Sequence, residues 1–246
     1  MKKMGWMWAF LATLLICPDL SAVISIRDIV RRADQARGNL EGVTWNLLVE
    51  SKERNRKSSM TLEAKARGFD FYSQTLAPAK YKGNKVIMIK GNMWFYRPGL
   101  SKPVPISKRQ RLMGNAAYGD IASTNYVSEY EATELAEENI SGEMCYVYDL
   151  KAIQKNTTYA RIKYWISKES LVGIKAEYFT VSGKMFKSAV MAYGNNVTID
   201  GEQRPFISKM IIHDELVTES NTTLNFTEPE LGALPDYIFN LNLLRK

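Results

Sequence analysis

The side chains that most often carry out catalysis are scarce in this 246-residue sequence. His213 is the single histidine, and Asp214 next to it is a poor acid–base partner, because successive residues of a strand point to opposite faces. One histidine and the thiol of Cys145 are too few for ordinary zinc ligation, or for a Ser-His or Cys-His couple. The sequence also has no G-x-S-x-G elbow, phosphate loop or dinucleotide fingerprint. We therefore predict that the protein is not an enzyme and uses no cofactor and no metal.

A carboxylate pair is the one catalytic arrangement that the residue types leave open. Asp70 with Asp120 or Glu143 is an example, and spatial proximity is invisible in a sequence. With 26 acidic residues in the chain, such pairs arise by chance. A pair therefore counts as a site only if its two carboxylates converge in a pocket.

The charge balance favours some partners over others. The chain has 33 Lys and Arg against 26 Asp and Glu, a net charge of +7. This excess is compatible with an anionic lipid or an acidic partner. It is spread along the chain without a concentrated stripe or recognition motif, so nucleic acid is not expected as a partner.

The N-terminus has the three-part pattern of a secretory signal peptide. Lys2 and Lys3 precede an uncharged run over Met4–Ile16, and small residues follow up to Ala22. The run is shorter than the roughly 20 residues that a membrane-spanning helix needs. We predict a signal peptide over residues 1–22, a single domain over 23–246, and a periplasmic location. Lipid modification of Cys17 is the alternative, although Ile16 stands where a small residue is usual.

One amphipathic helix begins the predicted domain. Over Ile26–Gly38 the apolar residues recur at intervals of three and four, opposite a row of arginines. Gly38 is expected to end the helix. The simplest expectation is that its apolar stripe packs on a sheet, and the alternative is a helix lying on a membrane surface.

From Gly42 onward the apolar period changes to two, which indicates strands. We expect about ten or eleven antiparallel strands, spaced as in a sandwich or barrel. Turns are predicted at Arg54–Lys57, Lys90–Asn92, Ser182-Gly183 and Asp200-Gly201. Cys145 lies among apolar neighbours in one of these segments, so we expect a buried, inert thiol.

The alternating pattern breaks between Pro98 and Tyr126. Three prolines exclude a central strand there, and a basic, helix-like stretch and a small-residue stretch follow over 107–122. A connection of this length inside a compact domain is usually functional or a lid. We expect 107–122 to be a movable lid.

Six blocks of sequence, in this order, resemble a known family. They are Asn92–Gly99 (NMWFYRPG), Ser107–Gly114 (SKRQRLMG), Tyr118–Tyr126 (YGDIASTNY), Arg161–Lys168 (RIKYWISK), Ala176–Lys184 (AEYFTVSGK) and Phe239–Leu244 (FNLNLL). The chain resembles the bacterial outer membrane lipoprotein-sorting proteins, a LolA-like family. The resemblance implies a mainly β, half-open antiparallel barrel with helices covering an apolar cavity. It also implies a periplasmic carrier of the acyl chains of lipoproteins or other lipids, which transfers them between membrane partners. An inner-membrane transporter or an outer-membrane acceptor is compatible with this role.

The resemblance and the aromatic strands together suggest which residues contact the ligand. As cavity or lid residues we nominate Trp94, Tyr96, Leu112, Met113, Tyr118, Ile121, Tyr148, Tyr164, Ile166 and Tyr178. The alternative is that part of this set is ordinary core. As contacts to a lipid headgroup or an acidic partner we nominate Lys108, Arg109 and Arg111, whose alternative is a solvated helix face.

A second function is compatible with the same fold. The chain is also similar in its β-half to the periplasmic regulator RseB, which implies a lipid-sensing regulator or an accessory subunit of an envelope transport system. A carrier is expected to retain lipid on purification, whereas a sensor is expected to form a stable complex with a membrane partner.

Overall fold

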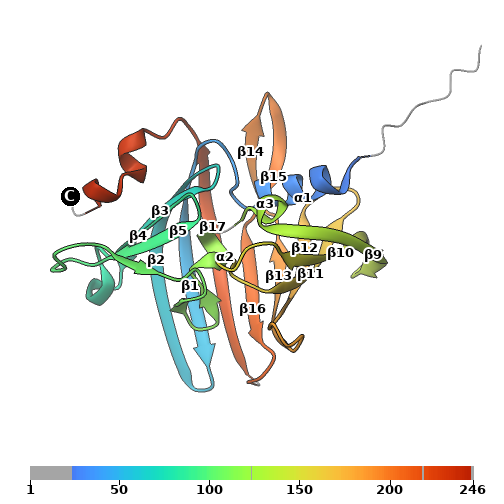
Figure 1. The fold of residues 1–246 in the computed structure, drawn as a ribbon, viewed down its shortest axis with the longest axis horizontal. Coiled ribbons are helices and arrows are strands. Elements are labelled where there is room, and N and C mark those ends of the chain that lie inside the picture. Colours follow the sequence, from blue (N-terminus) through green and yellow to red (C-terminus); the bar gives the residue numbers. More distant parts are fainter. Residues whose placement is uncertain (1–23, 123, 218, 245–246) are drawn as a thin grey trace, which may run out of the picture.

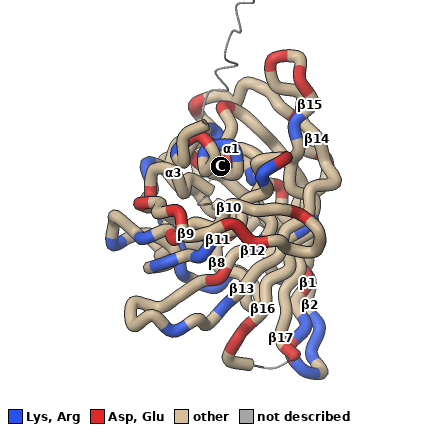
Figure 2. Tube along the Cα trace, turned by 90° about the vertical axis from the view of Figure 1, so that its right-hand side faces the viewer, with Lys and Arg blue, Asp and Glu red and all other residues tan. Residues whose placement is uncertain are grey.

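The computed structural model describes residues 24–122, 124–217 and 219–244. The predicted signal peptide and Cys17 lie outside the described residues. Within them, no helix is long and apolar enough to cross a membrane. In the view of Figure 2, basic and acidic residues are interspersed along the trace.

One large antiparallel sheet of 13 strands dominates the described structure (Figure 1). Its first half is a meander in which each strand pairs with the next: β1 (Val43–Glu53), β2 (Arg56–Arg67), β3 (Asp70–Ala77), β4 (Lys85–Ile89), β5 (Asn92–Tyr96) and β6 (Val104–Ile106). Its second half comprises β9 (Tyr130–Ile140), β10 (Glu143–Ala152), β11 (Arg161–Ser167), β12 (Gly173–Phe179), β13 (Met185–Ala192), β16 (Lys209–Asp214) and β17 (Ser220–Leu231). The pairing of β1 with β17 joins the halves, whereas β6 and β9 are the two open edges. The sheet is therefore curved but not closed, which confirms the half-open barrel.

The predicted turns connect neighbouring strands. Lys90 and Gly91, between β4 and β5, have φ of 49° and 78°, and Asp200 and Gly201 have 53° and 82°. Two successive positive φ values give the two-residue hairpin whose twist matches that of its strands. The second of these turns joins β14 (Asn195–Ile199) to β15 (Glu202–Phe206), which form a separate two-stranded sheet.

The main sheet has more strands than the ten or eleven expected. The largest addition is the edge strand β9, whose sequence YEATELAEENI is acidic and mostly exposed. A strand with both faces in water has no apolar alternation, so the period-two pattern fails there. Strands as short as β6 also have too few residues to show a period.

The concave face of the sheet contains the main core. Alternate residues of the strands point into it, for example Val43, Trp45, Leu47 and Val49 of β1. The Trp45 ring lies 6.1 Å from that of Phe71 and 6.0 Å from that of Phe206. On the opposite face of β10 and β11, Cys145, Val147 and Trp165 form a smaller cluster. Burial raises the pKa of the Cys145 thiol, as expected of a buried, inert group.

Helix α1 (Ile26–Gln35) covers one end of this core. The Ser25 hydroxyl oxygen accepts a hydrogen bond from the backbone N–H of Asp28, which caps the helix. Its predicted apolar stripe is buried, and Ile29, Val30 and Ala33 belong to the core. The helix ends earlier than predicted, in a turn where Gly38 has φ of 108° and a Cβ would lie 3.2 Å from the Trp45 ring.

The connection after β6 crosses in front of the middle of the sheet (Figure 1). It contains the two-stranded sheet of β7 (Arg111–Met113) and β8 (Ala116–Ala117), then the short helices α2 (Gly119–Ala122) and α3 (Tyr126–Glu129). Near the C-terminus, two 3-10 helices (Asp236–Phe239 and Leu241–Leu243) are attached through Arg67, whose guanidinium binds Asp236 at 2.6 Å.

Candidate functional site

The segment 107–122, which we call the covering segment, is attached to the sheet through polar contacts. At its β7–β8 turn, the backbone N–H of Asn115 donates to the Thr222 hydroxyl at 2.8 Å. The Asn115 side-chain amide donates to the Ser220 hydroxyl at 3.0 Å. Thr222 and Ser220 are buried polar residues on the concave side of β17. The contact between the turn and the sheet is therefore polar on both sides.

A buried charged cluster lies beneath the next part of the covering segment. The carboxylate of Asp120 accepts hydrogen bonds from the backbone N–H of Ala117 at 2.8 Å, from the Tyr159 hydroxyl at 2.5 Å and from the Lys187 ammonium at 2.8 Å. Lys187 also donates to the Tyr159 hydroxyl oxygen. Burial raises the pKa of Tyr159 well above its usual range, which keeps it a neutral hydrogen-bond donor.

A second buried cluster joins helix α1 to α3. The Asp34 carboxylate is fully buried and accepts the backbone N–H of Val127 at 2.9 Å. Burial raises the pKa of Asp34 to about 8. Arg37 packs over the Tyr126 ring at 5.0 Å and donates to the Asp120 carbonyl oxygen at 3.4 Å. Helix α1 therefore contacts α3 through Asp34, and the turn that follows α1 contacts the covering segment through Arg37.

Lys108 is buried, unlike the arginines that follow it. Its side chain is 3% exposed, and its ammonium forms an ion pair with the equally buried Glu129. A headgroup or partner contact of Lys108 stays a prediction, and it requires this ion pair to open. Arg109 and Arg111 are exposed, as that role requires.

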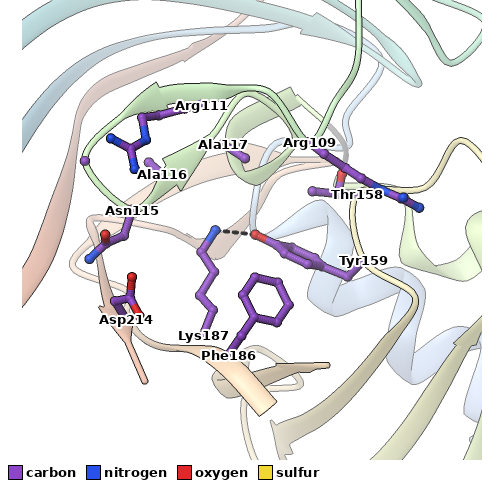
Figure 3. A pocket seen from close by; sticks show the side chains of 11 residues that line it. Arg109, Arg111, Asn115, Ala116, Ala117, Thr158, Tyr159, Phe186, Lys187 and Asp214 are labelled. Carbon is purple, nitrogen blue, oxygen red and sulfur yellow. Dashed lines mark hydrogen bonds between the residues drawn. The ribbon is translucent and has the colours of Figure 1, made fainter. Parts of the chain in front are cut away.

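A pocket of about 370 Å³ opens between the covering segment and the sheet (Figure 3). Its lining comes from four separate parts of the chain: the covering segment, the loop before β11, the start of β13 and the end of β16. The lining residues are Arg109, Arg111, Gly114, Asn115, Ala116, Ala117, Thr158, Tyr159, Phe186, Lys187 and Asp214. Lys187 and Tyr159 thus belong both to the buried cluster and to the pocket wall.

The nominated cavity or lid residues fall into three groups. Ile121, Tyr148, Tyr164, Ile166 and Tyr178 are fully or almost fully buried in the core. Leu112, Met113 and Tyr118 of the covering segment are partly buried against that core. In β5, by contrast, Met93 and Phe95 contact the core, so Trp94 and Tyr96 point to the other face of the strand. Trp94 lines a separate pocket of about 240 Å³ on that face, and a ligand-binding role for Trp94 and Tyr96 stays a prediction.

The carboxylates that the sequence left open are engaged separately. Asp120 lies in the buried cluster, whereas Asp70 accepts the backbone N–H of Lys90 at 3.2 Å and lies 3.8 Å from the Arg67 guanidinium. In the described part of the chain, no group of three or more His, Cys, Asp or Glu side chains is placed to hold a metal ion.

Lys187, Tyr159 and Asp214 are pocket residues that the sequence analysis did not nominate. The burial of Lys187 could have been predicted from the sequence pattern. Lys187 follows Met185 and precedes Ala189 and Met191 on the buried side of an alternating strand. A lysine in such a position requires a buried partner. Tyr159 lies in a loop without periodicity and gave no such signal.

Comparison with known proteins identifies the family. A family model described only as "-like: Uncharacterized protein" matches residues 70–246, well over half of the chain. A solved LolA superfamily protein from Nitrosomonas europaea has 28% sequence identity and a TM-score of 0.79, over 89% of this chain and 99% of that one. The chain belongs to the LolA superfamily.

Two further structures share the LolA-like fold at lower identity. An outer membrane lipoprotein-sorting protein domain from Vibrio parahaemolyticus is 19% identical, with a TM-score of 0.75 over 88% of this chain and 98% of that one. A DUF1329 family protein from Desulfovibrio piger is 23% identical, with a TM-score of 0.74 over 89% and 97% of the two chains. No curated protein matches the sequence. The resemblance read from the six sequence blocks is confirmed at the level of family and fold.

Proposed function

We propose that this LolA superfamily protein is a periplasmic carrier, which binds the acyl chains of lipoproteins or other lipids and transfers them between membrane partners. The observation that carries the proposal is the apolar concave face of the open sheet under a segment of short elements. Burial of an acyl chain against such a face is favourable by about 0.8 kcal/mol per CH₂. The predicted signal peptide and the name of the family support the location and the cargo.

Loading requires the covering segment to move. Its pocket of about 370 Å³ is at the lower end of the range for ligand sites, about 300–1,000 Å³. The apolar surface suited to acyl chains lies deeper, where side chains such as Leu47, Leu224 and Met210 line the concave face. Displacement of the covering segment exposes that surface.

The way in which the covering segment is attached suits repeated opening. The interface is mixed: Ile121 of the segment is buried in the core, whereas Asn115 and Asp120 bind Ser220 and Lys187 of the sheet through hydrogen bonds that water can replace when the segment leaves. An all-apolar interface loses its stabilisation on exposure to water, whereas a polar one loses less. The carrier is therefore expected to alternate between a covered and an open form.

Native mass spectrometry of the exported protein, prepared without detergent, tests the proposal. The expected result is a lipid or acylated peptide bound in stoichiometric amount, identified by extraction. Met113 of the covering segment is partly buried against the core, so Met113→Asp is expected to reduce the bound fraction. Val181→Asp is the matched control, because Val181 is 90% exposed in the turn between β12 and β13.

The absence of bound lipid would overturn the proposal that the protein is a carrier. If the protein keeps its polypeptide mass after incubation with lipid vesicles and with lipoprotein, it does not carry lipid. A stable complex with a membrane protein under the same conditions then favours a regulator or accessory subunit.

A further inference from the structure

Cationic and apolar side chains together line the pocket beneath the β7–β8 turn, and Arg111 and Arg109 lie on opposite sides of Lys187 and Tyr159 (Figure 3). We infer that it binds the oxyanion of an acidic lipid headgroup, with Arg109 and Arg111 as the principal contacts. The inference rests on the proposed function and deepens it, because it assigns a headgroup class to the cargo.

Two backbone carbonyl groups fix the Arg109 guanidinium, and neither neutralises its positive charge. Its Nε donates to the Thr157 carbonyl oxygen at 2.9 Å, and an Nη donates to the Lys155 carbonyl oxygen at 3.2 Å. Both acceptors are neutral, so the guanidinium keeps its full charge and has N–H groups left to donate. A guanidinium fixed in this way loses less conformational entropy when it binds a phosphate or carboxylate.

Arg111 supplies a second guanidinium from the same segment. Its side chain is 72% exposed, and its ion-pair partner Glu53 lies 3.9 Å away with a side chain that is 44% exposed. Such a contact in water contributes little, about 0–1 kcal/mol. Arg111 can therefore exchange Glu53 for a ligand oxyanion at small cost.

Lys187 adds a buried donor in the wall of the pocket. Its side chain is 7% exposed, and its ammonium donates to the Asp120 carboxylate and the Tyr159 hydroxyl. An ammonium has three N–H donors, so these two acceptors leave one for a ligand. Asp120 balances the charge of Lys187, and the two arginines therefore dominate the attraction for an anion.

Asp214 is the one acidic residue in the pocket lining. One of its carboxylate oxygens accepts the backbone N–H groups of Leu216 and Val217 at 2.8 and 3.1 Å. These two hydrogen bonds stabilise the Asp214 carboxylate within the turn after β16. The lining thus contains three cationic side chains and one anionic side chain that is engaged in its own turn.

The apolar walls favour a lipid over a soluble anion. Phe186, Tyr159, Ala116 and Ala117 line the same pocket as the two arginines. A free phosphate leaves these walls in contact with water, whereas a lipid buries them with its glycerol and first methylene groups. The volume of about 370 Å³ suits a headgroup and the start of the chains, and not complete acyl chains.

The experiment is a competition between two lipids with identical acyl chains. The exported protein is incubated with vesicles containing equal amounts of dioleoylphosphatidylglycerol and dioleoylphosphatidylcholine, and the bound lipid is counted by native mass spectrometry. We expect the wild type to prefer phosphatidylglycerol about tenfold. The double variant Arg109→Gln/Arg111→Gln is expected to bind both lipids about equally.

The matched control removes the same charge elsewhere. Lys82→Gln/Lys102→Gln changes two exposed lysines outside the pocket, and it is expected to keep the preference. A further arm adds glycerol 1-phosphate, the soluble headgroup, which is expected to compete only weakly. If the double variant does not fold, Arg111→Gln alone tests the site, because that side chain is mostly in water.

The outcomes separate this inference from the proposed function. Binding of both lipids without preference, or a preference that survives Arg109→Gln/Arg111→Gln, overturns the headgroup site and leaves the carrier standing. Competition by glycerol 1-phosphate at the affinity of the lipid also overturns it, in favour of a soluble phosphate ligand. Binding of neither lipid overturns the headgroup site, and the carrier is overturned as well only if incubation with lipoprotein also leaves the polypeptide mass unchanged.

Discussion

The Lys187 ammonium donates a hydrogen bond to the Asp120 carboxylate at 2.8 Å, and the two residues are 67 positions apart in the sequence. Lys187 lies on the concave side of strand β13, and Asp120 lies in α2 of the covering segment. Both side chains are almost completely buried. This ion pair therefore ties the covering segment to the sheet, and its stability depends on both partners being present.

Removal of one partner of this pair is expected to be costly. Lys187→Met leaves the Asp120 carboxylate buried without its counter-charge, and we expect the free energy of unfolding to fall by about 3–5 kcal/mol in urea titrations. The double variant Asp120→Asn/Lys187→Met is expected to lose less than the sum of the two single variants. Lys151→Met is the control, because Lys151 is 67% exposed and lies 4.0 Å from Asp149. Strictly additive losses would argue against a coupled pair.

Gly119 allows the covering segment to approach the loop before β11. A Cβ at this position would lie 2.0 Å from Oγ1 and 2.7 Å from Cγ2 of Thr158, which is buried. Gly119→Ala is therefore expected to lower the free energy of unfolding by about 1–3 kcal/mol through overpacking. Thr158→Ala in the same chain is expected to restore part of the loss, since it removes Oγ1 and Cγ2 and leaves only the Thr158 Cβ, at 2.9 Å. Gly232→Ala has open space and should change the urea midpoint little.

The sheet could be predicted from the sequence wherever one face is buried and the other is exposed. Tyr148, Tyr164 and Tyr178 lie on one side of neighbouring strands, and Trp165 lies on the other, as their alternation predicts. The pattern fails at β9, because an exposed edge strand has no apolar face. Periodicity therefore reports burial, and strands without a buried face are missed.

The pocket could not be predicted from periodicity, because its residues come from segments that meet only in the fold. Arg109 and Arg111 were identified by their charge, whereas the tertiary partners of Lys187 and Asp120 are invisible in the chain. The burial of Lys108 has the same origin, since Glu129 is 21 residues away. A charged residue in an otherwise apolar pattern, such as Lys187 in β13 or Asp34 in α1, is the signal that the sequence does contain.

The stability of the protein is expected to depend on pH through Asp34. Its pKa is raised to about 8 in the folded state, from an ordinary value of 3.8, because it is buried. Between these two values the folded state binds more protons than the unfolded state, so this group's contribution to stability falls as the pH rises from about 4 to about 8. Asp34→Asn keeps an acceptor for the Val127 N–H and does not titrate.

The measurement compares urea midpoints of the wild type and Asp34→Asn at pH 5 and pH 8. We expect the wild type to lose a few kcal/mol relative to the variant over this interval, since one pKa unit corresponds to about 1.4 kcal/mol. Asp200→Asn changes an exposed carboxylate in the β14–β15 turn and should follow the wild type. Parallel pH profiles for the wild type and Asp34→Asn would contradict a raised pKa.

Asn115 is expected to control how readily the covering segment opens. Its side chain exchanges two hydrogen bonds with Ser220, at 3.0 and 3.2 Å. Asn115→Ala removes both and should weaken the covered form by about 0.5–1.5 kcal/mol. If lipid uptake requires opening, the uptake rate should rise roughly fivefold for each kcal/mol. The rate is measured with fluorescent phosphatidylglycerol transferred from donor vesicles.

The control for this prediction is Gln110→Ala, an exposed residue of the same segment outside the pocket lining. Its uptake rate should equal that of the wild type. Amide hydrogen exchange gives an independent readout, because residues 107–122 should exchange faster in Asn115→Ala while β1 and β17 keep their protection. Faster exchange without faster uptake would mean that opening of the covering segment does not limit loading, and that lipid reaches the concave face by another route.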